Sequence, residues 1–453
     1  MTKNTRNFRP RGQQAPQPLP QGLQPRIVAA AVISEIASQG LNLDDRLAEG
    51  PAGRMADLEP RDRALVRSIS TVALRRLGTI RAALGQFLEK GLPRKANQLE
   101  WLLVAGAAQL LYMDVPDHAA VDLAVHAARR DPRMQPYASL VNAVLRNVAR
   151  ARVELQESND PFIDTPSWLA ARWRNHYGEE TARLIAHIHQ CEPTLDLTVK
   201  SDAPKWAKTL NGLLLPQGSV RLIEHTPISE LPGYDEGAWW VQDAAASLPA
   251  RLLNVKAGER VLDLCAAPGG KTAQLAVTGA EVTALDRSAE RMKRLSSNLE
   301  RLQLSATLQV GDVLTFEAPA FDAILLDAPC SATGTIRRHP DVAWIKRASD
   351  ITSLAGVQAK MLDRAFDLLK PGGRLVYCTC SLEPEEGEQQ IAAFMRRNPD
   401  VMRLPISPAE IGQLDPCINP DGDLRTLPSH LYDKDSRRSG LDGFFAARLT
   451  RRV

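Results

Sequence analysis

The sequence of 453 residues has little cysteine and no hydrophobic run long enough to cross a membrane. Six cysteines are too few for a disulfide scaffold, so the expected compartment is the reducing cytoplasm. A membrane-spanning helix needs roughly 20 consecutive apolar residues, and without one we expect no membrane partner. The cysteines also lack the paired spacing of zinc fingers, so we expect no bound metal.

The sequence also has no strong excess of charge of either sign. Lys and Arg number 56 against 53 Asp and Glu, which gives a net charge of +3. Attraction to nucleic acid must therefore come from local basic patches. Residues 1–23 form one such patch, a basic tail rich in Pro and Gln that we expect to be disordered. Two interpretations stay open for it: a solvated tail without a role, or an arm that contacts phosphates.

The remaining sequence is apolar enough for a globular protein of several domains. Residues 24–155 have apolar side chains at helical spacing and predict an all-α domain. Its polar faces are rich in arginine, which indicates either an ordinary solvated surface or one that holds an RNA backbone. Residues 156–240 begin with two helical stretches and continue with short strand-like segments, which predicts a small α+β connector.

Residues 241–453 alternate between apolar runs of strand length and amphipathic helices. This alternation predicts an α/β domain with a parallel sheet wrapped by helices. The helices are expected near 289–304 and 351–369. The strands are expected at residues 261–265, 282–286, 307–310, 321–327 and 373–380.

A candidate cofactor site follows the first of these strands. Residues 266–270 are small, and small residues let the backbone approach a ligand, although a Gly-Gly turn also fits a purely structural role. Asp286 ends the next strand, where a carboxylate can bind ribose hydroxyl groups. Asp312 and Asp327 follow the third and fourth strands, at the edge where open α/β sheets bind ligands.

Two other cofactor classes fit the glycine pattern poorly. Gly270-Lys271-Thr272 resembles the end of a phosphate-binding loop, but that loop requires glycine where Cys265 stands. The dinucleotide-binding fingerprint of glycines is also absent. A nucleoside triphosphatase and a nicotinamide enzyme are therefore both disfavoured.

Two cysteines are expected at the same edge of the sheet. Cys330 follows the strand that ends at Asp327, and Cys380 ends a later strand. Buried cysteines usually serve only in packing, and we accept this interpretation for Cys191 and Cys417. For Cys330 and Cys380, a shared strand edge, a neighbouring carboxylate and a cofactor pocket favour a catalytic role instead.

Together these motifs resemble those of the RNA cytosine-C5 methyltransferases of the nucleolar-protein/Sun family. The helical N-terminal segment resembles the NusB-like RNA-binding domain of the bacterial branch that modifies 16S ribosomal RNA. The motifs that carry the resemblance are LDLCAAPGGKT (262–272), LLDAPCSATGTIRRHPDVAW (325–344), PGGRLVYCTCS (371–381), VQDAAAS (241–247) and DGFF (442–445).

The resemblance implies a Rossmann-like, seven-stranded, mostly parallel sheet that binds S-adenosylmethionine. Lys271 is either a cofactor contact or simply a helix-terminal lysine. Residues 241–453 are then the catalytic domain. The residues implied to bind the cofactor are Cys265, Ala266, Ala267, Pro268, Gly269, Gly270, Lys271, Asp286, Asp312 and Asp327.

The family resemblance also implies that Cys380 is the nucleophile. Carbon 5 of cytosine is too weak a nucleophile to take the methyl group directly, and a thiolate added at carbon 6 activates it. We assign Cys330 as the acid/base partner that assists release, and Asp327 as the group that binds the N3/N4 edge. The two cysteines could exchange roles. Cys378 lies two positions from Cys380 on one strand, so both are expected to face the same side.

Ribosomal RNA, with 16S rRNA as the expected molecule, is the implied partner of a monomeric enzyme. Arg337, Arg338 and His339 follow the Pro-Cys motif and are expected to contact phosphates or bases at the pocket mouth. An accessible single-stranded loop or end is the expected target. The competing hypothesis is a non-catalytic RNA-binding or ribosome-assembly protein.

Overall fold

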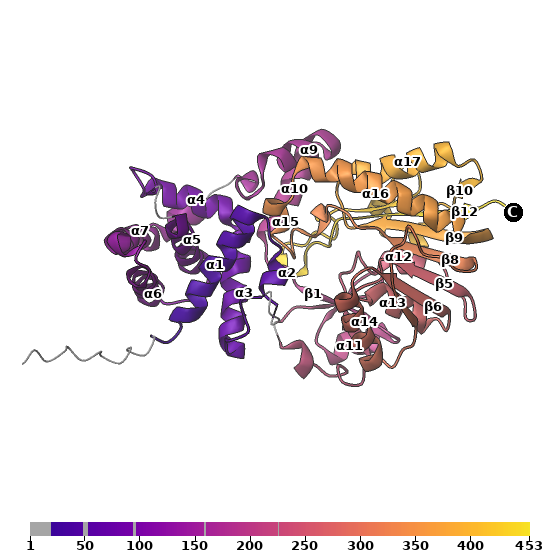
Figure 1. Ribbon diagram of the computed structural model, residues 1–453, viewed down its shortest axis with the longest axis horizontal. Helices are drawn as coiled ribbons and strands as arrows, with labels where there is room; N and C mark the ends of the chain where they lie inside the picture. Colours follow the sequence, from indigo (N-terminus) through magenta and orange to yellow (C-terminus); the bar gives the residue numbers. More distant parts are fainter. Residues whose placement is uncertain (1–19, 49–52, 94–96, 158–159, 225) are drawn as a thin grey trace, which may run out of the picture. The chain divides into compact units, whose positions relative to one another are not determined.

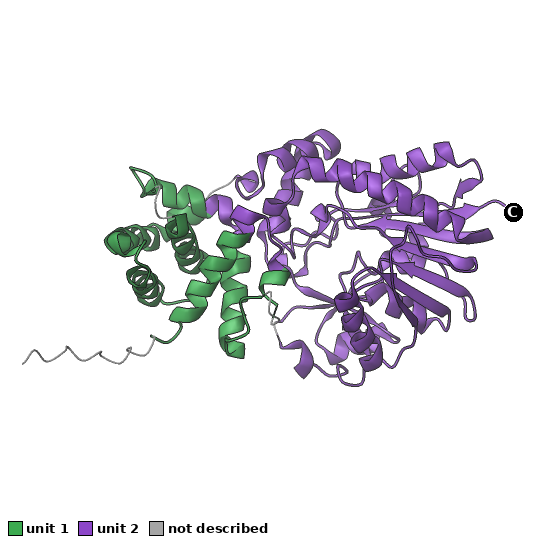
Figure 2. Cartoon of the chain, viewed as in Figure 1, with its two compact units in different colours: residues 1–35, 44–73, 80–158 green, residues 36–43, 74–79, 159–453 purple. Residues whose placement is uncertain are grey.

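The computed structural model describes residues 20–48, 53–93, 97–157, 160–224 and 226–453 (Figure 1). Most of the predicted basic tail, residues 1–19, lies outside this described part. The chain forms two compact units (Figure 2). Unit 1 comprises residues 1–35, 44–73 and 80–158, and unit 2 comprises residues 36–43, 74–79 and 159–453.

Unit 1 is helical, as the spacing of its apolar residues predicts. Its central helix, α5 (Asn97–Tyr112), is buried at nearly every position from Leu99 to Leu111. The helices α6 (Asp117–Arg130) and α7 (Ala138–Arg150) pack against it. Gly106 permits this packing, because an added Cβ would lie 2.7 Å from a methyl group of Leu145. The helices of this segment are α1 (Leu23–Gln39), α2 (Leu43–Arg46), α3 (Pro60–Arg75), α4 (Leu77–Gln86), α5 (Asn97–Tyr112), α6 (Asp117–Arg130), α7 (Ala138–Arg150) and α8 (Arg152–Gln156).

Unit 2 begins with the helices and strands predicted for the connector. Helices α9 (Ser167–Tyr177) and α10 (Glu179–Gln190) come first. A small antiparallel sheet follows, in the order β2-β3-β1-β4. Its strands are β1 (Leu195–Val199), β2 (Leu213–Leu214), β3 (Val220–Leu222) and β4 (Trp239–Val241), with α11 (Ala203–Thr209) after β1. The connector clusters with the large sheet as one unit, and its boundaries at 156 and 240 stay predictions.

The large sheet of unit 2 has the predicted mostly parallel arrangement. In the described part of the chain, seven strands follow the order β10-β12-β9-β8-β5-β6-β7, with β11 beside β12. Strands β5 to β9 pair in parallel, and β12 joins β9 antiparallel. The strands are β5 (Arg260–Leu264), β6 (Glu281–Asp286), β7 (Thr307–Val310), β8 (Phe321–Asp327), β9 (Leu369–Thr379), β10 (Val401–Arg403), β11 (Leu424–Thr426) and β12 (Phe444–Arg451).

Helices cover both faces of this sheet (Figure 1). Alternate residues of β5 point to opposite faces, so Val261 joins one core cluster and Leu262 the other. Helices α12 (Leu248–Leu252) and α13 (Gly270–Val277) pack on the first face, and α16 (Ala348–Asp367) and α17 (Glu388–Arg397) on the second. Among the described residues, no helix is long and apolar enough to cross a membrane.

A buried ion pair holds the small sheet together. Arg221 on β3 donates to both carboxylate oxygens of Asp196 on β1, at 2.7 and 2.9 Å, and both side chains are fully buried. Arg221 also donates to the backbone carbonyls of Arg438 and Gly440. The pair therefore links the connector to the C-terminal segment of unit 2.

Replacing Arg221 with methionine should destabilise unit 2 strongly. Arg221→Met leaves the Asp196 carboxylate buried without its cation, which costs about 3–5 kcal/mol. Arg183→Met is the control, because Arg183 pairs with Glu179 on the surface and both side chains are half exposed. That change should cost less than about 1 kcal/mol. Chemical denaturation of both variants checks this, and equal losses would contradict it.

Candidate active site

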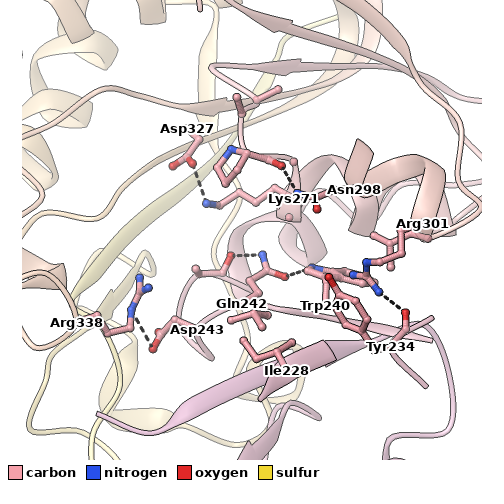
Figure 3. Close-up of a pocket in the computed structure, with 18 of the residues that line it drawn as sticks. Ile228, Tyr234, Trp240, Gln242, Asp243, Lys271, Asn298, Arg301, Asp327 and Arg338 are labelled. Atoms are coloured by element: carbon pink, nitrogen blue, oxygen red, sulfur yellow. Dashed lines mark hydrogen bonds and ion pairs between the residues drawn. The ribbon is translucent and has the colours of Figure 1, made fainter. Parts of the chain in front are cut away.

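A cavity of about 610 Å³ lies at the carboxyl end of β5 (Figure 3). Its volume falls within the roughly 300–1,000 Å³ typical of small-molecule sites. The backbone of residues 266–271 forms one wall, and the side chains of Trp240 and Gln242 form another. Asp327, at the end of β8, and Arg338 reach the same cavity. The structure therefore brings most of the predicted cofactor residues to one concave surface.

The loop from Cys265 to Gly270 is held by buried carboxylates beneath it. Asp286 is 4% exposed, and it accepts hydrogen bonds from the backbone N–H groups of Ala267, at 3.2 Å, and Ser288, at 2.9 Å. Asp263 is fully buried and accepts from the hydroxyl of Thr272 at 2.6 Å. Burial raises the pKa of Asp263 to about 7. These contacts fix the turn between β5 and α13.

Gly269 is required by the shape of this loop. Its φ of +103° lies in the left-handed region, and an added Cβ would come within 2.7 Å of the side chain of Leu295. Gly269 is the N-terminal cap of α13, so the N–H groups of the first turn of α13 lie at the loop. A bare backbone wall next to a helix N-terminus suits a ligand that carries a carboxylate.

Three predicted cofactor residues lie outside the lining of this cavity, as far as the described residues define it. Cys265 packs against the core, and burial together with neighbouring carboxylates raises the pKa of its thiol to about 12. Asp286 acts on the loop rather than on the cavity. Asp312 accepts from the backbone N–H of Leu314 at 2.9 Å.

The cavity also contains residues that the sequence did not identify. Arg301 on α14 (Ala289–Arg301) lies over the ring of Tyr234, 4.3 Å from its centroid, and donates to the Tyr234 carbonyl at 2.7 Å (Figure 3). The indole N–H of Trp240 donates to Gln242 at 2.9 Å. Gln242 lay within a recognised motif, VQDAAAS, while Tyr234 and Trp240 had no sequence signal.

Asp327 connects the cavity to the cysteines. Lys271 donates to one of its oxygens at 2.8 Å, and the thiol of Cys378 lies 3.4 Å from the other. Burial by itself would lower the pKa of Lys271, but the Asp327 carboxylate outweighs it and raises that pKa above its ordinary value. Lys271 therefore lines the cavity as a charged partner of Asp327, in addition to its place at the start of α13.

Cys330 and Cys380 lie together beside this pair. Their sulfur atoms are 3.4 Å apart, and both residues are partly exposed, whereas Cys378 is buried. Cys378 and Cys380 both contact the same core cluster, but only Cys380 meets Cys330. The hydrogen bond to Cys380 and burial raise the pKa of Cys330 well above its ordinary value. Cys330 is therefore held as a neutral thiol.

The structure corrects one expectation about the basic run after the Pro-Cys motif. Arg337 is 2% exposed, and its guanidinium donates to two buried carboxylates, Asp243 and, at 2.9 Å, Asp442. It supports the fold and does not lie on a surface that RNA reaches. Arg338 also donates to Asp442, yet its side chain is 32% exposed and lines the cavity. His339 is partly exposed.

Known protein families match both units. The sequence profile described as "16S rRNA methyltransferase RsmB/F" matches residues 250–450, and that of the NusB family matches residues 23–150. The chain is 38% identical over 394 residues to the "Ribosomal RNA small subunit methyltransferase B" of Yersinia pestis bv. Antiqua. This match covers 83% of the chain and 90% of the relative.

Solved structures share the fold. The crystal structure of PH0851 matches with a TM-score of 0.71 and 22% identity, covering 96% of this chain and 99% of that one. A methyltransferase homologue from Pyrococcus horikoshii matches with a TM-score of 0.53 and 29% identity, covering 65% and 98%. These matches confirm the predicted fold class, and the match to the methyltransferase family confirms the S-adenosylmethionine cofactor. Among the described residues, no cluster of His, Cys, Asp or Glu could hold a metal ion.

Replacing Gly269 with alanine should weaken S-adenosylmethionine binding. The added Cβ meets Leu295 and strains the turn, so the loop must move and the dissociation constant should rise at least about tenfold. Gly372→Ala is the control, because Gly372 also has a left-handed φ, of +73°, but lies on β9, where an added Cβ would make only an ordinary contact of 3.5 Å with a methyl group of Val453. Calorimetric titration should show wild-type affinity for Gly372→Ala, and wild-type affinity for Gly269→Ala would contradict the assignment.

Proposed function

Because the chain belongs to the RsmB/F family of 16S rRNA methyltransferases, we propose that it methylates carbon 5 of a cytosine in 16S rRNA through a covalent cysteine adduct. One observation carries this proposal. Two thiols lie 3.4 Å apart at the ends of adjacent parallel strands, and Asp327, which ends the first of these strands, lines the cofactor cavity. S-adenosylmethionine, when bound, supplies the electrophilic methyl group.

The residues around the cavity fit that cofactor. The backbone of Ala266 to Lys271 would hold its amino-acid part, and the ring of Trp240 and the amide of Gln242 offer apolar and polar contacts. Asp286 holds the backbone of this loop in position through its hydrogen bond with the N–H group of Ala267. Asp312 stays a predicted contact outside the cavity lining.

Cys380 is the proposed nucleophile. Its thiolate adds to carbon 6 of the flipped cytosine, and the electron pair of the 5,6 double bond then makes carbon 5 nucleophilic. Cys330 is better suited to a proton-transfer role, because its raised pKa keeps it protonated near neutral pH. After methyl transfer, solvent water accepts the proton of carbon 5, and the electron pair of that C–H bond re-forms the 5,6 double bond as the bond between Cys380 sulfur and carbon 6 breaks. The Cys330 thiol assists this release by donating its proton to the departing Cys380 sulfur, 3.4 Å away, and regains a proton from solvent.

Asp327 and Lys271 are the proposed base-binding groups. Asp327 is 30% exposed, so its carboxylate can meet the N3/N4 edge of a cytosine beside the cavity. Lys271 holds that carboxylate in place through the 2.8 Å contact. Arg338 and His339 are the proposed RNA contacts near the cavity mouth, and Arg337 is left out because it is buried. A monomer acting on a single-stranded region of the RNA completes the proposal.

Substitution of the two cysteines should separate their roles. Cys380→Ala should abolish both methylation and the covalent RNA adduct, because no sulfur then reaches carbon 6. Cys330→Ala should form the adduct and accumulate it, since release is impaired. Denaturing gel electrophoresis of enzyme with transcribed 16S rRNA and S-adenosylmethionine measures the adduct.

Bisulfite sequencing of 16S rRNA tests the reaction itself. Cells without the protein should lose one 5-methylcytosine signal, and the wild-type gene should restore it while the Cys380→Ala gene does not. If 16S rRNA from cells without the protein keeps every 5-methylcytosine signal, the proposed cytosine chemistry is wrong. A Cys330→Ala enzyme that forms no adduct, with Cys380→Ala accumulating it, would instead exchange the roles of the two cysteines.

A further inference from the structure

A buried carboxylate lies behind the two thiols and contacts both segments that carry them. Glu386 ends the short 3₁₀ helix Pro384–Glu386 and is fully buried. Its oxygens accept from the backbone N–H of Ser331, at 2.9 and 3.2 Å, and from the Ser331 hydroxyl. They also accept from the hydroxyl of Ser381 at 2.6 Å. Ser331 follows Cys330 and Ser381 follows Cys380, so one carboxylate joins the two cysteine segments.

Glu386 is itself fixed from two other elements. Gln358 on α16 donates to its carboxylate at 3.0 Å and to the carbonyl of Pro329 at 2.9 Å. Tyr377 and Thr379 on β9 donate to the Glu386 backbone carbonyl, at 2.8 and 3.1 Å. The carboxylate therefore has no freedom to move away from the serines.

Structural stability alone is a weak reason for a carboxylate at this position. Within the described residues, Glu386 forms no ion pair. The groups that donate hydrogen bonds to its carboxylate are all neutral. A buried charge without a cation is costly. Burial raises the pKa of Glu386, and the serine and glutamine hydrogen bonds oppose that rise. Its negative charge in turn contributes to the raised pKa of Cys330.

We propose that Glu386 is a positioning residue that holds the Cys330 and Cys380 thiols in contact for release of the methylated cytosine. The inference rests on the proposed function, because it concerns the step in which Cys330 assists elimination. Glu386 touches neither thiol in the structure and acts through Ser331 and Ser381. Loss of its bridge lets the two segments separate, and a displacement of about 1 Å at reacting groups can cost roughly 100-fold in rate.

Glu386→Gln tests this with little change in shape. Its amide cannot accept from all the donors that surround Glu386, so the bridge weakens. With transcribed 16S rRNA, kcat should fall about 100-fold while KM for S-adenosylmethionine stays within about twofold. The covalent adduct should accumulate, as expected for Cys330→Ala. A purely structural defect would lower the folded fraction and every activity together.

Glu383→Gln is the matched control. Glu383 is also a buried carboxylate of the same loop, but it pairs with Arg172 and accepts from Trp173 at 3.2 Å. The Glu383→Gln variant should be less stable than the wild type but should not accumulate the adduct. If Glu386→Gln fails to fold, Ser381→Ala removes only one arm of the bridge and should show the same accumulation to a smaller extent.

A double-mutant cycle decides whether Glu386 acts through Cys330. In the Cys330→Ala background, Glu386→Gln should change the rate of adduct release by less than about twofold, because both variants impair the same step. Additive effects, or a Glu386→Gln enzyme with wild-type turnover, would overturn the positioning role. Failure of the proposed function is distinguishable, since neither Cys330→Ala nor Cys380→Ala would then accumulate an adduct.

Discussion

The parallel pairing of β8 with β9 is the constraint on which the site depends. Asp327 lies opposite Cys378 in the register, and the backbone continues to pair beyond the strands, from Ala328 N–H to the Cys378 carbonyl at 2.9 Å. Gly334 N–H then donates to the Cys380 carbonyl at 3.0 Å. Parallel strands end at the same edge, so segments distant in sequence must meet there. β5, paired on the other side of β8, brings Lys271 to Asp327.

Two carboxylates of the site lie in different environments, and this difference separates the roles proposed for them. Asp327 is partly exposed and forms an ion pair with the ammonium of Lys271 beside the cavity. Glu386 is fully buried among neutral donors, so its contribution is geometric and electrostatic rather than a contact with substrate. In the proposed mechanism the accessible charge recognises the base and the enclosed charge aligns the thiols.

Much of this arrangement follows from the sequence because strand ends are easy to locate. The predicted strands at 307–310 and 321–327 match β7 and β8, and the rule for carboxyl ends of parallel strands brought Asp327, Cys330 and Cys380 together. The burial of Arg337 could not be predicted, since its carboxylate partners lie 94 and 105 residues away. Tyr234, Trp240 and Glu386 reach the site only through tertiary packing, which leaves no local pattern.

The most direct test of the account identifies the atom that bonds to the RNA. Transcribed 16S rRNA containing 5-fluorocytidine should trap the enzyme, because fluorine replaces the hydrogen that must leave carbon 5. Trypsin and nuclease digestion followed by mass spectrometry then locates the modified cysteine. The account predicts a nucleotide on the peptide 375–396, with fragmentation assigning it to Cys380 rather than Cys378. A nucleotide on the peptide 302–337, at Cys330, or no covalent complex at all would contradict it.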